Sequence, residues 1–124
     1  AIRDLRENTQ PTHIHFFKSL PIELFAPLLN NAGCIVGNSS TGIREASFLG
    51  LPSVNIGTRQ NGRERGLNVI DVSCNREKIL EAIRSQLAHG FYESSKCYGD
   101  GTAGVALAHI LLEKDITQQK TIAY

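Results

Sequence analysis

Short apolar runs alternate along the chain with stretches in which apolar residues recur every three or four positions. Runs that end at turn-forming residues are typical of buried strands, whereas the wider spacing is typical of helices with one apolar face. The runs at residues 13–17, 34–36, 54–56 and 68–72 are therefore predicted to form strands.

Four helices are predicted between and after these strands. The first covers residues 21–32, where a proline suits the opening turn, and the second covers residues 41–49. Asn75 is expected to cap the third helix, and the fourth spans residues 103–114. The apolar faces of the first and third helices consist of Ile22, Phe25, Leu28 and Leu29, and of Ile79, Leu80, Ile83 and Leu87.

The alternation of strands and helices predicts an α/β fold, a Rossmann-like parallel sheet with helices on both faces. Residues 1–116 are expected to form one domain, followed by a polar tail at residues 117–124. The chain opens without a methionine, so it is expected to be a piece of a longer protein.

The composition is that of an ordinary globular domain, with 41% hydrophobic and 20% charged residues. A formal net charge of +1 gives no overall field that would attract nucleic acid or an anionic membrane. No apolar stretch approaches the roughly 20 residues of a membrane span. Any anion that binds must therefore be held by a local arrangement of groups.

The three cysteines are Cys34, Cys74 and Cys97, which are odd in number and widely spaced. This pattern favours free thiols over a disulfide framework or a zinc site. Reduced thiols suit a cytoplasmic protein.

Two loops are expected to form the ligand site. Open parallel sheets bind ligands beyond the carboxyl ends of their strands. Residues 37–42 follow one predicted strand and residues 57–66 follow the next, so both loops should lie on one rim. The pattern of strands and loops alone therefore predicts a ligand site at the carboxyl edge of the sheet.

The first loop has small residues where a strand gives way to a helix. Free N–H groups and the helix dipole favour an anion there, and Ser39 and Ser40 add hydroxyl donors next to Gly42. A plain helix cap by Ser40 or Thr41 is the alternative. Glu45 would repel a phosphate, so it suits either sugar hydroxyls or compensation of the helix dipole.

The second loop carries three arginines within seven residues. The planar guanidinium matches phosphate oxygens, although a solvated mobile loop is the alternative. Arg59, nearest the strand end, is the first candidate for an anion contact and Arg63 is the second.

Other candidate groups are weaker. His13 and His15 alternate on a predicted strand but have no third metal ligand nearby, so no metal or other cofactor is expected. No set of residues suggests a catalytic triad. The Phe25 side chain is expected either to pack in the core or to stack on a nucleotide base.

Three motifs in the same order closely resemble those of UDP-N-acetylglucosamine 2-epimerases that release N-acetylmannosamine. The resemblance covers about residues 16–112. The motifs are GCIVGNSS with GIRE at residues 33–45, PSVNIGTRQ with GRE at residues 52–64, and YGDG at residues 98–101.

The resemblance implies the C-terminal half of a two-domain, glycosyltransferase-B-type fold. It implies that the other half supplies the catalytic carboxylates, that the enzyme forms a homo-oligomer, and that this half alone is inactive. No residue of this chain is therefore assigned to catalysis. The implied UDP contacts are Ser39, Ser40 and the amides around Gly42 on the diphosphate, Glu45 on the ribose, Arg59 on the phosphates, Phe25 on the uracil face and the Leu20 backbone on its polar edge.

Two departures favour the hydrolysing branch of that family, which serves sialic-acid-type sugar synthesis. Non-hydrolysing members resemble this chain less, because they carry Asp-Ser-Gly-Gly at residues 38–41 and Thr-Glu-Arg-Pro-Glu in the loop at residues 58–64. A non-hydrolysing epimerase that forms UDP-N-acetylmannosamine, a UDP-N,N′-diacetylbacillosamine 2-epimerase and a B-type glycosyltransferase remain alternatives. A UDP-sugar sensor without enzymatic activity is a further alternative.

Overall fold

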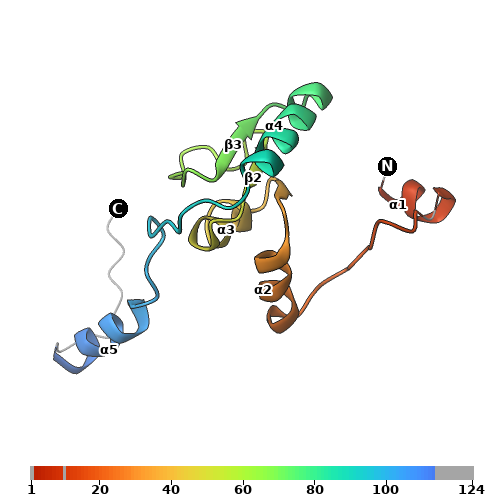
Figure 1. The fold of residues 1–124 in the computed structure, drawn as a ribbon. Helices are drawn as coiled ribbons and strands as arrows, with labels where there is room; N and C mark the ends of the chain where they lie inside the picture. Colours follow the sequence, from red (N-terminus) through yellow and green to blue (C-terminus); the bar gives the residue numbers. More distant parts are fainter. Residues whose placement is uncertain (1, 10, 114–124) are drawn as a thin grey trace, which may run out of the picture. The chain divides into compact units, whose positions relative to one another are not determined.

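The computed structural model describes residues 2–9 and 11–113. The chain divides into two compact units, Ala1–Ala32 and Gly33–Tyr124. Figure 1 labels their helices and strands. The predicted tail at residues 117–124 lies outside the described residues.

The first unit is helical where it has regular structure. The α-helix α1 (Ile2–Asp4) continues into the π-helical turn η1 (Leu5–Thr9), and a longer helix, α2 (Ile22–Asn31), follows. Pro21 precedes α2 as expected. Of the predicted apolar face of α2, Leu29 is buried and Phe25 is half-buried, whereas Ile22 and Leu28 are exposed.

The strand predicted at residues 13–17 is wrong. A strand is stable when its backbone groups pair with a neighbouring strand, and the described residues provide no such partner here. The N–H of Ile14 donates instead to the carbonyl of Pro11, which closes a turn. The apolar, aromatic composition of this run therefore does not decide its structure.

The second unit contains a parallel sheet with the strand order β1-β2-β3 among the described residues. The strands are β1 (Ile35–Gly37), β2 (Ser53–Ile56) and β3 (Val69–Val72). Val54 of β2 pairs with Val36 on one side and with Ile70 on the other. These strands confirm the predictions at residues 34–36, 54–56 and 68–72 to within one residue.

Helices cover both faces of this sheet. The 3-10 helix η2 (Ser40–Gly42) and α3 (Glu45–Leu49) follow β1, and α4 (Arg76–His89) follows β3. The side chain of Ser53 faces η2, since a Cβ atom on Gly42 would lie 2.7 Å from its Oγ. Ile56 faces the other way and lines a groove with Ile79, Leu80 and Ile83 of α4. The α/β class with a Rossmann-like sheet is thus confirmed.

A buried glutamine joins α4 to the sheet. The side chain of Gln86 is fully buried, and its Nε2 donates to the carbonyls of Ser53 at 2.8 Å and Asn68 at 2.7 Å. Its Oε1 accepts from the Tyr92 hydroxyl at 2.7 Å. Every polar atom of this amide is therefore used, as a buried polar group requires.

Asn68 extends this buried polar network to α3. Its Nδ2 donates to the Leu51 carbonyl at 2.8 Å. The Ser47 hydroxyl lies 2.7 Å from Asn68 Oδ1 and 2.6 Å from the Ile43 carbonyl. The network thus ties both layers of helices to the sheet. The buried apolar side chains among the described residues of the same unit include Ile43, Ala46, Leu51, Val54 and Ala82.

The segment after α4 runs along α3 without regular structure. The N–H of Tyr92 donates to the Gly50 carbonyl at 2.8 Å, and the N–H of Ser95 donates to the Ser47 carbonyl at 2.9 Å. Gly50 has φ of 68°, and a Cβ atom there would lie 2.1 Å from the Tyr92 carbonyl oxygen, so only glycine fits. The helix α5 (Ala103–Glu113) follows, and none of its residues is buried.

Replacing Gln86 by Met should destabilise the fold. The change keeps the side-chain volume similar but removes the donor from two buried carbonyls and the acceptor from Tyr92. We expect the free energy of unfolding of the intact protein to fall by about 2–4 kcal/mol, measured by urea denaturation. Glu81→Met on the same helix is the control, because Glu81 is exposed. Equal losses for both variants would contradict a role for the buried bonds.

Candidate anion-binding site

Two loops meet at the carboxyl edge of the sheet. Gly37 ends β1 and Ile56 ends β2, and the two strands are parallel neighbours. Beyond these ends, Nε2 of Gln60 donates to the Asn38 carbonyl at 2.7 Å. The prediction that residues 37–42 and 57–66 share one rim is therefore confirmed.

The first loop forms a capped turn. Ser39 is the N-cap of η2, and its Oγ accepts from the Thr41 N–H at 3.3 Å. The predicted alternative placed this cap at Ser40 or Thr41, whereas the structure places it one or two residues earlier. Ser39 has the extended backbone that a cap requires. Gly42 is buried, and its N–H donates to the Ser39 carbonyl at 3.2 Å.

The helix predicted from residue 41 to residue 49 is divided. The 3-10 turn ends at Gly42, and α3 begins only at Glu45. Arg44 between them has φ of −93° and ψ of −72°, at the edge of the right-handed helical region. The close approach of Gly42 to Ser53 of β2 holds the turn against the sheet, which explains the break. Glu45 is therefore the exposed first residue of α3 rather than a residue one turn into a longer helix.

One arginine of the second loop anchors the loop to the sheet. Arg65 Nε lies 3.0 Å from Asp71 Oδ2, and its Nη2 donates to the Gln60 carbonyl at 2.9 Å. Nη1 of the same guanidinium donates to the Arg63 carbonyl. Asn55 of β2 also donates to the Asp71 carboxylate. The charge of Arg65 is thus neutralised within the protein.

The other two arginines are available to a ligand. Arg59 and Arg63 are both exposed, and neither forms an ion pair with a carboxylate in the part of the chain that the structure describes. Both belong to the loop that Arg65 fastens. The loop that carries the exposed Arg59 and Arg63 is thus joined at Gln60 to the loop that carries Ser39 and Ser40, and groups of these types suit an anion with several oxygens.

Two polar contacts of the second loop escaped sequence reasoning. Gln60 is only 3% exposed, although the residues on either side of it are exposed. The Tyr98 hydroxyl of the third motif donates to the Glu64 carbonyl at 2.9 Å. The sequence shows only that Gln60 and Tyr98 belong to the motifs at residues 52–64 and 98–101, and a motif does not reveal which atoms its residues contact.

Phe25 and Leu20 belong to the first unit. Phe25 lies on α2, Leu20 just before it, and both are half-buried. Their predicted contacts with a uracil ring remain predictions. His13 and His15 are exposed, and no group of three potential metal ligands occurs among the described residues.

The remaining sequence features are simple to place. Cys34, Cys74 and Cys97 are all free thiols, and burial raises the pKa of Cys34. None of the helices in the described ranges, 2–9 and 11–113, has the length and apolar character to cross a membrane.

The fold defines a Rossmann-like domain in which two loops meet at the carboxyl edge of the sheet. A family model described as UDP-N-acetylglucosamine 2-epimerase matches residues 1–112. The chain therefore belongs to the UDP-N-acetylglucosamine 2-epimerase family, and its sheet is consistent with the glycosyltransferase-B-type fold expected of that family.

Similar curated proteins come from several bacteria. The chain is 39% identical over 85 residues to a UDP-N-acetylglucosamine 2-epimerase of Neisseria meningitidis serogroup B, covering 68% of this chain and 22% of the relative. It is 40% identical over 97 residues to a hydrolysing UDP-N,N′-diacetylbacillosamine 2-epimerase of Legionella pneumophila, covering 78% of this chain and 26% of the relative. The chain thus spans about a quarter of the length of these relatives.

The ion pair at the base of the loop gives a pH-dependent prediction. Burial raises the pKa of Asp71, but hydrogen bonds from Arg65 and Asn55 and the charge of Arg65 outweigh it, so this pKa lies below its usual value. The stabilisation is therefore present above the unfolded pKa of about 3.9 and is lost as pH falls through the folded pKa.

Asp71→Asn should lower the melting temperature slightly at neutral pH, because the pair is partly exposed. The difference from the unaltered protein should shrink below about pH 4. Thermal melts at a series of pH values measure it, with Glu93→Gln as the control at an exposed carboxylate. A difference that stays constant into acid would contradict the assigned ion pair.

Proposed function

We propose that this chain is the UDP-binding half of a hydrolysing UDP-N-acetylglucosamine 2-epimerase, which releases UDP and N-acetylmannosamine for sialic-acid-type sugar synthesis. The observation that carries the proposal is the junction of the two loops at Gln60 and Asn38. It joins the loop that carries Ser39 and Ser40 to the loop that carries Arg59 and Arg63, which supports binding of a diphosphate at this edge of the sheet.

The hydrolysing branch is supported by two separate features. Relatives from Legionella pneumophila and Campylobacter jejuni are named as hydrolysing epimerases, at 40% and 42% identity. The loop residues 38–41 and 58–64 also differ from the pattern of non-hydrolysing members. Because both of these relatives are named for diacetylbacillosamine substrates, a UDP-N,N′-diacetylbacillosamine is the second candidate.

In the proposed reaction, a base removes the proton at C2 of the sugar while the bond from C1 to the UDP oxygen breaks. Water then adds at C1 and a proton returns to the opposite face of C2. The base and acid are expected from the other half of the enzyme. Ser39, Ser40, Arg59 and Arg63 would stabilise the negative charge that develops on the leaving UDP.

Further contacts complete the proposed site. Glu45 would accept hydrogen bonds from the ribose hydroxyls, and Phe25 and Leu20 would bind the uracil. The complete enzyme is proposed to be a cytoplasmic homo-oligomer with the active site between its two halves. Because the reacting carboxylates lie in the other half, this chain by itself should be inactive.

Product analysis tests the reaction directly. We expect the full-length protein to convert UDP-N-acetylglucosamine into free UDP and N-acetylmannosamine, identified by NMR. UDP-N-acetylmannosamine as the product would contradict hydrolysis and indicate the non-hydrolysing branch. Turnover of only the diacetylbacillosamine donor would change the substrate, and turnover that needs a sugar acceptor would indicate a glycosyltransferase.

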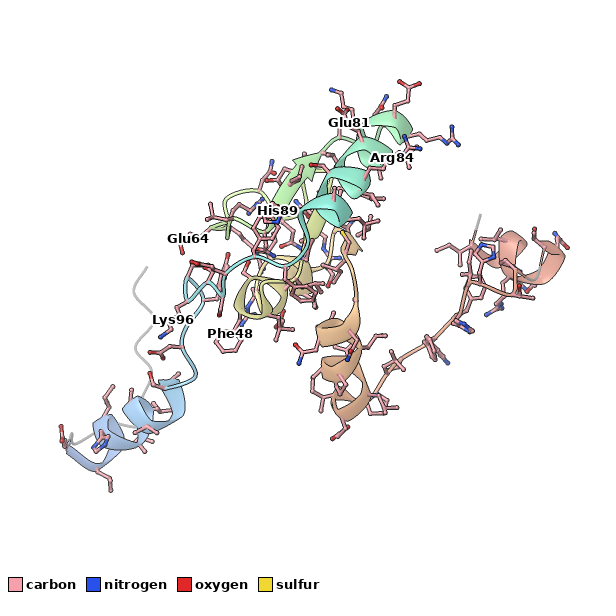
Figure 2. The ribbon with its side chains drawn as sticks, in the orientation of Figure 1. Phe48, Glu64, Glu81, Arg84, His89 and Lys96 are labelled. Atoms are coloured by element: carbon pink, nitrogen blue, oxygen red, sulfur yellow. The ribbon has the colours of Figure 1, made fainter. Side chains whose placement is uncertain are left out.

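Arg59→Ala should lower kcat and raise KM in the full-length enzyme, because its charge would act on both bound substrate and the leaving group. A lost charge-assisted hydrogen bond predicts a decrease in kcat/KM of about ten- to a hundredfold. Arg84→Ala is the control, since Figure 2 shows Arg84 pointing away from the sheet on α4. An unchanged kcat would show that Arg59 binds only the ground state.

A further inference from the structure

We propose that Gln60 is a positioning residue that holds the two loops of the UDP site in register. The inference rests on the proposed function and adds a residue that touches neither the phosphates nor the sugar. It is drawn from three observations: the burial of Gln60, its two bonded neighbours and its unpaired oxygen.

Gln60 is bonded on both sides. Its side chain donates to the Asn38 carbonyl of the first loop at 2.7 Å. Its own carbonyl accepts from Arg65, which is fixed to Asp71 on β3. One residue thus connects the end of β1 to β3 through the second loop. Since a buried amide is costly to leave without partners, this geometry resists small displacements.

The positions of these bonds matter for the ligand. The accepting carbonyl belongs to the peptide that immediately precedes Ser39, the cap of η2. Gln60 itself immediately follows Arg59. A change at Gln60 therefore displaces the loop that carries Ser39 relative to the loop that carries Arg59. A displacement of the order of 1 Å is enough to weaken the binding of a ligand that contacts both loops.

The side-chain oxygen of Gln60 indicates that the residue does more than stabilise the fold. Oε1 of Gln60 is buried and has no hydrogen-bond partner in the described part of the structure. An unpaired buried oxygen is destabilising, so an apolar side chain of similar volume would suit the folded state about as well. What Met cannot supply at this position is the bond to Asn38.

Gln60→Met therefore separates positioning from stability. In the full-length enzyme we expect UDP to bind about tenfold more weakly, measured by calorimetry, with a rise in KM for the sugar nucleotide. The melting temperature should change little. Asn61→Ala is the matched control, because Asn61 is the exposed neighbour of Gln60 in the same loop; it should bind UDP as the unaltered enzyme does.

Gln60→Glu gives a readout that a purely structural role would not produce. An ionised carboxylate cannot donate to the Asn38 carbonyl, whereas a protonated carboxyl can. Burial raises the pKa of a carboxyl, so protonation is reached at mildly acidic pH. The UDP affinity of this variant, relative to the unaltered enzyme, should rise as pH falls from about 8 to about 5. Gln60→Met should show no such recovery.

The outcomes separate the two proposals. Normal UDP affinity in Gln60→Met would overturn the positioning role and leave the proposed function standing. A large fall in melting temperature together with unchanged UDP affinity would likewise show a structural role only. Failure of the unaltered full-length enzyme to bind UDP would overturn the proposed function and the inference together.

Discussion

The parallel pairing of β1 with β2 is the constraint on which the site depends. Parallel neighbours end at the same edge of a sheet, so the chain leaves Gly37 and Ile56 in the same direction. Two loops that are distant in the sequence are thereby brought to the same edge of the sheet. The bond from Gln60 to the Asn38 carbonyl then closes the remaining gap.

The buried polar network of Gln86, Asn68 and Ser47 stabilises this arrangement of strands. Gln86 bonds to the carbonyls of Ser53 and Asn68 at the start of β2 and just before β3, and Asn68 reaches Ser47 on α3. Hydrophobic contacts alone would fix the spacing of the layers but not their register, because they are not directional. Hydrogen bonds are directional, so the network also orients α3 and the turn that precedes it.

Sequence patterns gave the buried elements and missed the contacts that assemble them. The strands at residues 34–36, 54–56 and 68–72 are predictable because each is a short apolar run next to turn-forming residues. The cap at Asn75 is predictable because asparagine is favoured at that position, and its Oδ1 accepts from the Lys78 N–H in the structure. The run at residues 13–17 is also short and apolar, but it has no paired neighbouring strand among the described residues. Gln60 was not predictable, because a glutamine in a polar loop carries no sign of burial.

The three arginines of the second loop show why position, and not residue type, divides their roles. Arg65 forms an ion pair with Asp71 on the neighbouring strand, so its charge is neutralised within the fold. Arg59 and Arg63, by contrast, are exposed. The anchored cation holds the backbone that carries the other two. In the proposed reaction this matters because a charge stabilises a leaving group best when it is already in place. With a net charge of only +1, the chain has no long-range field to substitute for that local order.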